Sequence, residues 1–320
     1  MILQLLYRWA APAGRDSRLT VMIYHRVLRQ PDPLLPSEPD EREFEARMRN
    51  VKAWFNVLPL TDAIARLRSG TLPERPLAIS FDDGYADNVE VALPVLRRLE
   101  LPATFFIASG FLDGGRMWND TVIESVRRRT GDVLDLSALG LGCYDIPSVQ
   151  QKKATIDSLL QKLKYLEDAQ RTDLVARIAE TCASPLPHDL MMTSAQVREL
   201  HHAGMTIGGH TVSHPILSKL SESCAEAEIA QGKERLEEII GTPIALFAYP
   251  NGKPGRDYGP EHVAIVKKIG FVGAVSTAWG TATTGCDILQ VPRFTPWDRS
   301  EWRYGIRLAQ NLRRSRYVTA

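Results

Sequence analysis

The sequence has few cysteines, no long apolar run and no excess of charge of either sign. Its four cysteines are far apart and form neither a CxxC pair nor a zinc-ribbon spacing, so no disulfide framework is indicated and a reducing compartment fits. No stretch approaches the roughly 20 apolar residues that cross a bilayer. The formal net charge of +1 gives no general attraction to nucleic acid. We therefore expect a globular, cytoplasmic protein that does not bind nucleic acid.

Both ends of the chain carry short helical patterns. Near the N-terminus, four apolar residues are spaced as on one face of a helix: Ile2, Leu5, Leu6 and Trp9. The apolar run there is too short for the core of a signal peptide. This predicts an amphipathic helix that packs on the body of the protein rather than lying on a membrane. Near the C-terminus, the segment 303–316 is rich in arginine. A solvated helix is favoured there, and contact with an anionic membrane surface or partner, which would make the protein membrane-peripheral, is the alternative.

Short apolar runs alternate with amphipathic patterns along most of the chain. The runs are rich in β-branched and aromatic residues and lie at Thr20–Tyr24, Asn56–Leu60, Leu77–Phe81, Ala103–Ala108, Met205–Gly209, Ala245–Tyr249, Val272–Ser276 and Leu289–Phe294. Helical patterns between them include Asp40–Phe55, Asp87–Glu100, Ser223–Ile240 and Pro260–Ile269. This alternation favours an α/β fold, a distorted (β/α) barrel of about seven to eight strands. An open doubly wound sheet is the alternative, but no glycine-rich phosphate turn follows the first run.

The segment 113–190 breaks the alternation. It contains helical patterns at Thr121–Arg129, Val149–Glu167 and Thr172–Thr181 and no convincing strand. It is also far longer than an ordinary connection between barrel elements. We therefore predict a single catalytic domain over residues 1–320 with a helical insertion at 113–190, which shapes access of the substrate.

Polar residues that can carry chemistry stand at the ends of the predicted strands, where barrel enzymes place their working groups. These residues are His25 after the first run, Asp82 and Asp83 after the third, His210 and then His214 after the fifth, and Arg293 near the end of the last. The alternatives are a polar turn for the two aspartates, ordinary surface histidines for His210 and His214, and a buried strand-end histidine for His25. Because the same position recurs at several strands, the sequence predicts one site.

Adjacent carboxylates at a strand end repel each other unless a cation or a proton offsets the repulsion. Successive side chains of a strand diverge, so Asp83 can face an ion while Asp82 faces water or substrate. His210 and His214 can converge on the same ion if the segment between them turns helically. Two imidazoles and one carboxylate are a ligand set of catalytic zinc. We predict zinc, with cobalt, nickel, manganese and iron(II) as alternatives.

Two motifs resemble those of the polysaccharide deacetylase superfamily, also called carbohydrate esterase family four, with its NodB-like domain. The Ser80–Gly84 sequence SFDDG is similar to the first motif, and this implies that Asp82 is the catalytic base and Asp83 a metal ligand. The His210–His214 sequence HTVSH is similar to the second motif, whose histidines complete the metal site. The resemblance covers roughly residues 19–294 apart from the insertion.

The third motif of the family resembles the sequence FAYP at Phe247–Pro250, which implies that the backbone N–H of Tyr249 helps to hold the oxyanion. The family's base-orienting arginine is missing there, and we hypothesise that Arg293 takes its role. A catalytic acid histidine near the C-terminus is also missing, because no histidine follows Arg293. The sequence MIYHRV at Met22–Val27 resembles instead the opening of the circularly permuted poly-N-acetylglucosamine deacetylases. This resemblance implies that His25, on the first strand, is the acid.

The family resemblance implies a metal-dependent hydrolase that removes N-acetyl groups from N-acetylhexosamine units of a polysaccharide or of its lipid-linked precursor. The sequence Trp118-Asn119-Asp120 could stack on and hydrogen-bond a sugar ring, or Trp118 could simply pack. Relatives that hydrolyse cyclic amides or formamides share the motifs, so a non-carbohydrate C–N bond is the enzymatic alternative. A non-catalytic sugar-binding relative is the other alternative, which is disfavoured because all three metal ligands are present.

Overall fold

Parallel strands form the centre of the computed structural model, which describes residues 2–295, 298 and 300–320 and, for residues 2–5, the backbone alone. Within these residues, seven parallel strands follow one another around one sheet. In spatial order they are β1 (Thr20–Tyr24), β3 (Pro76–Phe81), β4 (Thr104–Ile107), β7 (Thr206–Gly209), β8 (Leu246–Ala248), β9 (Gly273–Trp279) and β10 (Val291–Arg293). A short strand, β2 (Asn56–Val57), pairs with the start of β3. Each apolar run of the sequence therefore contains a strand.

The first and last strands bring the sheet back onto itself. The Ile23 N–H donates to the carbonyl of Phe294 (3.2 Å), and the Phe294 N–H donates to the carbonyl of Val21 (2.8 Å). Phe294 also forms a parallel bridge with Met22. The prediction of a distorted barrel is confirmed, as a nearly closed ring, and the open-sheet alternative is wrong.

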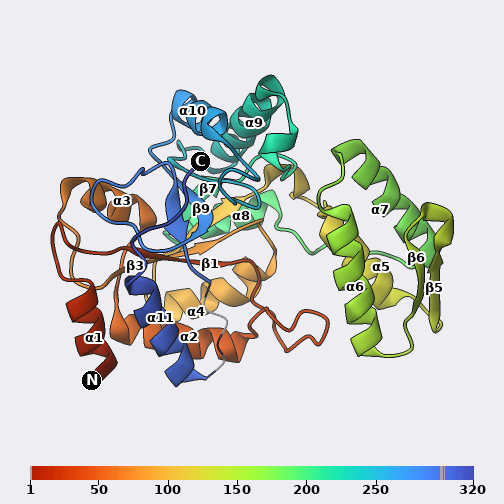
Figure 1. Ribbon diagram of the computed structural model, residues 1–320, viewed down its shortest axis with the longest axis horizontal. Helices are drawn as coiled ribbons and strands as arrows, with labels where there is room; N and C mark the ends of the chain where they lie inside the picture. The colour runs from red at the N-terminus through yellow and green to blue at the C-terminus, as the bar shows by residue number, and fades with distance from the viewer. Residues whose placement is uncertain (1, 296–297, 299) are drawn as a thin grey trace.

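Helices cover the outside of the sheet (Figure 1). They are α2 (Glu41–Trp54), α3 (Leu60–Ser69), the π-helical η1 (Asn88–Ala92) continuing into α4 (Leu93–Arg98), α8 (Ser194–His202), α9 (Glu222–Ile240) and α10 (Pro260–Ile269), with short 3-10 turns η2 (Ser109–Phe111) and η4 (Leu217–Lys219). Local sequence sets their ends. The Asp40 carboxylate accepts the Glu43 N–H at the start of α2 (2.8 Å). Gly241 and Gly270 end α9 and α10 with φ of 73° and 94°, where a side chain would be strained.

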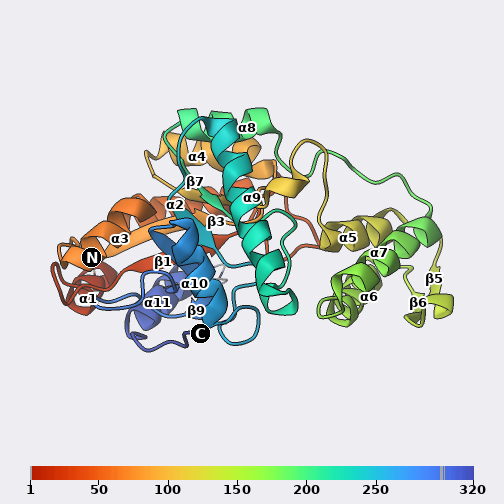
Figure 2. The same cartoon turned by 90° about the horizontal axis from the view of Figure 1, so that it is seen from above.

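A separate group of helices and strands lies to one side of the barrel (Figures 1 and 2). It consists of α5 (Trp118–Arg128), β5 (Val133–Leu136), η3 (Ser137–Leu139), β6 (Gly142–Asp145), α6 (Val149–Leu163) and α7 (Asp168–Cys182). These elements share an apolar cluster that includes Val122, Leu134, Leu159 and Ile178. The expected absence of strands here is wrong, because β5 and β6 form an antiparallel hairpin. Along β5, exposed and buried residues alternate over only four positions, with Leu134 and Leu136 buried. This pattern is too short to predict a strand from the sequence. The role of the 113–190 segment as an insertion stays a prediction.

The terminal helices, α1 (Ile2–Ala10) and α11 (Glu301–Leu312), pack against each other. The buried Tyr7 hydroxyl donates to the Gly305 carbonyl (2.8 Å), so α1 packs on the body of the protein as expected. Trp9 and Trp302 point outward, with 76% and 60% of their surfaces exposed. The side chains of Ile2 and Leu5 lie outside the described residues. In the described part of the chain, no helix combines the length and the apolar character needed to span a membrane.

Aromatic packing holds the end of β3 in place. The Phe81 ring stacks on Phe105, with centroids 4.7 Å apart, and on Tyr24, 5.5 Å away. The Phe44 ring of α2 meets Phe81 at a steep angle. Because these buried rings come from β1, β3, β4 and α2, they set the position of the residues that directly follow Phe81.

Candidate active site

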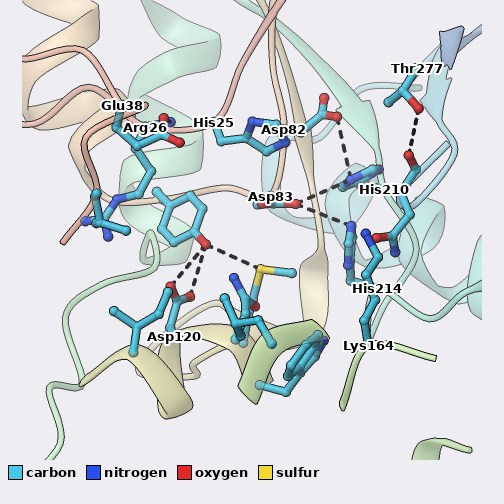
Figure 3. A pocket seen from close by; sticks show the side chains of 18 of the residues that line it. His25, Arg26, Glu38, Asp82, Asp83, Asp120, Lys164, His210, His214 and Thr277 are labelled. Carbon is cyan, nitrogen blue, oxygen red and sulfur yellow. Dashed lines mark hydrogen bonds and ion pairs between the residues drawn. The ribbon is translucent and has the colours of Figure 1, made fainter. Parts of the chain in front are cut away.

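Three side chains from two loops meet at the carboxyl ends of β3 and β7 (Figure 3). Asp83 Oδ1 lies 3.5 Å from His210 Nε2 and 3.4 Å from His214 Nε2. The two imidazole centroids are 4.7 Å apart. One ligand atom from each residue falls within 4.8 Å of the others. The structure thus brings together the three residues predicted to bind the metal.

The backbone around these residues is unusual. Asp83, Thr211 and His214 have φ of 77°, 65° and 54°. These values lie in the left-handed region, which is unfavourable for residues other than glycine. Each such residue costs on the order of 1–3 kcal/mol, and such strain concentrates at functional sites. The rings of His210 and His214 therefore converge through an irregular turn, whereas the spacing alone suggested a helical one.

Contacts outside the cluster hold both histidines. His210 Nδ1 hydrogen-bonds the Ala248 carbonyl at the end of β8 (2.7 Å), which places the proton on Nδ1 and leaves Nε2 free to bind an ion. The Glu228 carboxylate of α9 accepts the N–H groups of Val212 and Ser213 (3.0 and 2.9 Å). Helix α9 also approaches this turn at Gly232, where a Cβ would lie 2.7 Å from the Thr211 carbonyl carbon. The turn is thus fixed from both sides.

The cluster fits a metal ion. Asp83 Oδ1 is buried and accepts no hydrogen bond from the described residues. Burial opposes ionisation of Asp83, but the nearby imidazoles of His210, His214 and His25 outweigh it and lower its pKa. Burial lowers the pKa of His214 to about 4, so its imidazole is neutral at pH 7. One carboxylate and two neutral imidazole nitrogens are what zinc and similar ions require.

Asp82 is held by an arginine from the last strand. The fully buried Arg293 of β10 donates from Nη1 to Asp82 Oδ1 and from Nη2 to Oδ2, each at 2.6 Å. Its Nε donates to the Ser276 carbonyl on β9 (3.0 Å). Burial would raise the pKa of Asp82, but Arg293 and His210 outweigh it, and the net pKa is lowered. This is the contact that the hypothesis for Arg293 requires, and it keeps Asp82 ionised in one orientation.

The structure contradicts the role expected for Tyr249. Its backbone N–H donates to the Val275 carbonyl (3.2 Å), because Tyr249 continues the ladder between β8 and β9. Its hydroxyl donates to the Leu289 carbonyl (3.0 Å), and its ring stacks on Tyr258 at 3.9 Å. Tyr249 is therefore a core residue with no donor free for an oxyanion. Two residues later, Asn251 reaches the pocket with φ of 58°.

A cavity of about 690 Å³ opens above the cluster. Its wall on the barrel side contains Asp82, Asp83, His210, His214 and, at the rim, the exposed His25. Figure 3 shows the His25 ring directed toward the two aspartates, and its charge acts on both of them. The 113–190 segment supplies the opposite wall with Trp118, Asn119, Asp120, Gln161 and Lys164. The barrel and the segment thus enclose one pocket.

Several pocket residues escaped the sequence analysis. Glu38, Tyr85, Lys164 and Thr277 belong to none of the quoted motifs. They come from two separate loops, the end of α6 and strand β9. Tyr85 was the easiest of them to predict from the sequence, since it directly follows the Ser80–Gly84 motif. For the other three, no local pattern signals that they face the same cavity.

Asp120 forms a buried pair with Tyr85. It is 3% exposed, and the Tyr85 hydroxyl donates to its Oδ2 (3.1 Å). Burial raises the pKa of Asp120 to about 7. Trp118, two residues earlier on α5, has the Arg171 guanidinium 5.4 Å from its ring centroid. Stacking of a sugar on Trp118 stays a prediction.

The fold and the site define the protein as a (β/α) barrel that carries a histidine–carboxylate cluster and a second carboxylate at the ends of its parallel strands. The family model for polysaccharide deacetylases matches residues 69–131 and 162–274, more than half of the chain, and the protein belongs to this family. The match breaks off between β5 and the end of α6, inside the segment beside the barrel. The resemblance inferred from the motifs is confirmed, and the family supports a hydrolase that deacetylates polysaccharides.

Individual relatives are distant in sequence. The chain resembles the deacetylase PplD of Streptococcus pyogenes, solved in complex with acetate, with 17% identity, 92% of this chain and 98% of that chain covered, and a TM-score of 0.60. It resembles IcaB from Ammonifex degensii with 19% identity, coverage of 94% and 98%, and a TM-score of 0.60. YxkH of Bacillus subtilis (strain 168), provisionally named a polysaccharide deacetylase, is 19% identical over 271 residues, 84% of this chain and 68% of YxkH. Both solved structures share the fold.

Replacing Asp120 with asparagine should change how stability depends on pH. Because the folded pKa, about 7, exceeds the ordinary value of 3.8, the unfolded chain releases this proton first as pH rises. The folded state therefore loses stability between about pH 4 and 7, by at most about 4 kcal/mol. Asp120→Asn abolishes this loss and keeps an acceptor for Tyr85. We measure the free energy of unfolding in urea, with EDTA present, for Asp120→Asn and the wild type. We expect the difference, variant minus wild type, to increase from pH 5 to pH 8.

The exposed Asp145 of the same segment provides the matched control, and Asp145→Asn should differ from the wild type equally at both pH values. A stability difference for Asp120→Asn that is the same at pH 5 and pH 8 would show that the buried carboxyl does not titrate in this range.

Proposed function

We propose that the protein is a metal-dependent deacetylase that removes N-acetyl groups from N-acetylhexosamine units of a polysaccharide or of its lipid-linked precursor. The main observation behind this proposal is the position of Asp83 Oδ1. This buried oxygen accepts no hydrogen bond from the described residues and lies 3.5 and 3.4 Å from Nε2 of His210 and His214. These three residues would hold the ion, and zinc suits them best, with cobalt, nickel, manganese and iron(II) as alternatives. When bound, the ion supplies Lewis acidity to a water molecule and to the acetyl carbonyl.

Asp82 is the general base in this proposal. Its Oδ2 lies 3.9 Å from His210 Nε2, so it stands beside the metal ligands without being one of them. The two hydrogen bonds from Arg293 hold both carboxylate oxygens, which fixes the direction in which Asp82 accepts a proton from water. Arg293 acts through Asp82 and is a positioning residue.

His25 is the general acid in this proposal and donates a proton to the leaving amine of the sugar. It follows β1, and its carbonyl accepts a hydrogen bond from Asn88 Nδ2 (2.9 Å), which anchors the backbone at the rim. Glu38 lies on the same side of the pocket (Figure 3). Burial raises the pKa of this carboxyl, and the nearby His25 and Arg26 oppose that shift.

The backbone N–H of Asn251 replaces that of Tyr249 as the oxyanion donor in this proposal. Within the described residues this N–H makes no hydrogen bond, whereas the Asn251 carbonyl accepts one from Thr277 Oγ1 (2.8 Å). Asn251 lines the pocket, so its free donor can meet the oxygen that becomes negative during acyl transfer.

Peripheral contact of the protein with a membrane stays a prediction. The exposed Trp9 and Trp302, on the neighbouring helices α1 and α11, are the apolar groups that such contact would use.

Removal of a ligand should remove the metal. We expect Asp83→Ala and His214→Ala to reduce the zinc content of the purified protein from about one ion per chain to near zero, because two ligands alone bind zinc weakly. Atomic emission measures the metal. His202→Ala, at an exposed position on α8, is the control and should retain zinc. Full zinc occupancy in both ligand variants would contradict the assignment.

Removal of the base should separate rate from metal content. We expect Asp82→Asn to retain zinc but to release acetate from N-acetylated glycans about 10²–10⁴-fold more slowly, as for loss of a general base. The assay compares a panel of N-acetylhexosamine oligosaccharides with small cyclic amides, and the wild type should hydrolyse only the glycans. Asp157→Asn, exposed on α6, controls for the change of charge. Wild-type turnover in Asp82→Asn, or exclusive hydrolysis of cyclic amides, would refute the proposal.

Removal of the acid should depend on the leaving group. We expect His25→Ala to lower acetate release from glycans by about 10²-fold or more, because an amine leaves only when it is protonated. The same variant should retain most of its activity toward p-nitrophenyl acetate, whose leaving group needs no proton. An equal loss on both substrates would instead indicate that His25 supports the structure of the pocket.

A further inference from the structure

We propose that the catalytic pocket contains an anion-binding subsite formed by Lys164 and Lys253, so that the preferred substrate carries a carboxylate or phosphate close to the N-acetylated sugar. This inference rests on the proposed function and names the class of glycan. Lys164 comes from the end of α6 in the 113–190 segment, and Lys253 from the connection between β8 and α10. Both side chains line the cavity that contains the Asp83, His210 and His214 cluster.

Charge is distributed unevenly across this pocket. In Figure 3, Glu38 and Asp120 lie on one side of the cluster, and Lys164 lies on the other, with His214 and Thr277. Arg26, on the acidic side, is already neutralised by Asp87 at 2.7 Å. The positive charge of Arg26 is therefore already paired within the protein, whereas Lys164 and Lys253 present their charges to the cavity.

Lys164 is half-buried, and its ammonium group has no carboxylate within ion-pair distance among the described residues. Its closest described partner is the ring of Tyr165, 5.7 Å from Nζ. Its backbone N–H donates to the Leu160 carbonyl (3.0 Å), so the residue caps α6, where the helix terminus favours a positive charge. A positioned but unpaired ammonium group in a catalytic cavity is suited to bind an anion.

Two further cations lie close to Lys164. The Arg256 guanidinium lies 4.1 Å from the centroid of the Tyr165 ring, which holds it next to the end of α6. Burial lowers the pKa of Lys164, and Lys253 and Arg256 lower it further against the opposing effect of Asp257. These like charges are therefore close enough to repel one another.

One carboxylate offsets this repulsion only in part. Asp257 is fully buried, and its Oδ2 accepts the backbone N–H of Lys253 (3.0 Å). This carboxylate helps to position the loop that carries Lys253. It leaves an excess of positive charge at the cavity wall, and an anionic group of the substrate would offset that charge.

The chemistry of the subsite selects anionic oxygen and does not distinguish its source. Lysine binds carboxylates and phosphates as a point charge, without the planar fork of arginine. The anion could therefore be a uronic acid next to the N-acetylhexosamine, or the phosphate of a lipid-linked precursor. Separate probes distinguish the two.

The test compares three soluble probes: a neutral N-acetylglucosamine oligosaccharide, one of equal length that alternates N-acetylglucosamine with glucuronic acid, and UDP-N-acetylglucosamine as a diphosphate-linked sugar. Acetate release and calorimetric binding are measured for the wild type, Lys164→Gln, Lys164→Arg and Lys153→Gln. Lys153, which is partly exposed on the same helix and paired with Asp157, is the matched control. Thermal unfolding verifies that each variant is folded.

We expect the wild type to prefer one anionic probe over the neutral one by about tenfold or more in kcat/KM and in Kd, an effect of the size of one ion pair in a partly buried site. Lys164→Gln should reduce this preference about tenfold, mainly through KM. Lys164→Arg should restore it, and Lys153→Gln should keep it. High salt should weaken binding of the anionic probe to the wild type more than to Lys164→Gln.

Equal Kd values for neutral and anionic probes, or a preference that Lys164→Gln does not change, would overturn the subsite. Failure of the proposed function gives a different result, in which no probe releases acetate while the anionic probe still binds through Lys164. A preference for the glucuronate probe identifies the anion as a sugar carboxylate, and a preference for UDP-N-acetylglucosamine identifies it as a phosphate.

Discussion

The buried pair between Asp82 and Arg293 is the constraint on which the catalytic end of the barrel depends. Burying an unpaired carboxylate is very unfavourable, so Asp82 can be buried only where an arginine reaches both of its oxygens. That arginine comes from the last strand, β10, and Asp82 follows an early one, β3. The contact exists only when β10 closes against β1. The orientation of the Asp82 carboxylate therefore depends on closure of the barrel.

A second constraint holds the histidines. The turn after β7 places Thr211 and His214 in left-handed conformations, which are unfavourable unless the surroundings fix them. Glu228 of α9 supplies that fixation through two backbone N–H groups. A helix on the outside of the barrel thus determines the geometry of a cluster on its end. An ion bound by Asp83 and the two imidazoles would stabilise the same strained turn.

The pocket divides its tasks between two parts of the chain. Groups suited to proton transfer and metal binding come from strand ends of the barrel, which tightly packed aromatic rings hold in place. Groups suited to recognition, among them Trp118, Asp120 and Lys164, come from helices beside the barrel. The family model leaves residues 132–161 of that segment unmatched, although it covers these three residues. This arrangement allows substrate preference to change while the chemical groups keep their positions.

The sequence alone determined the strands, the polar residues at their ends and the family, because apolar periodicity and short motifs are local signals. It also led to the hypothesis for Arg293, from the place of this residue near the end of the last strand. Only the tertiary structure decided that Tyr249 has no free N–H, that β5 and β6 pair, and that Lys164 lines the same cavity as the histidine–carboxylate cluster. These facts depend on which distant segments become neighbours. Hydrogen-bond partners and pocket walls follow from that packing, which no local pattern encodes.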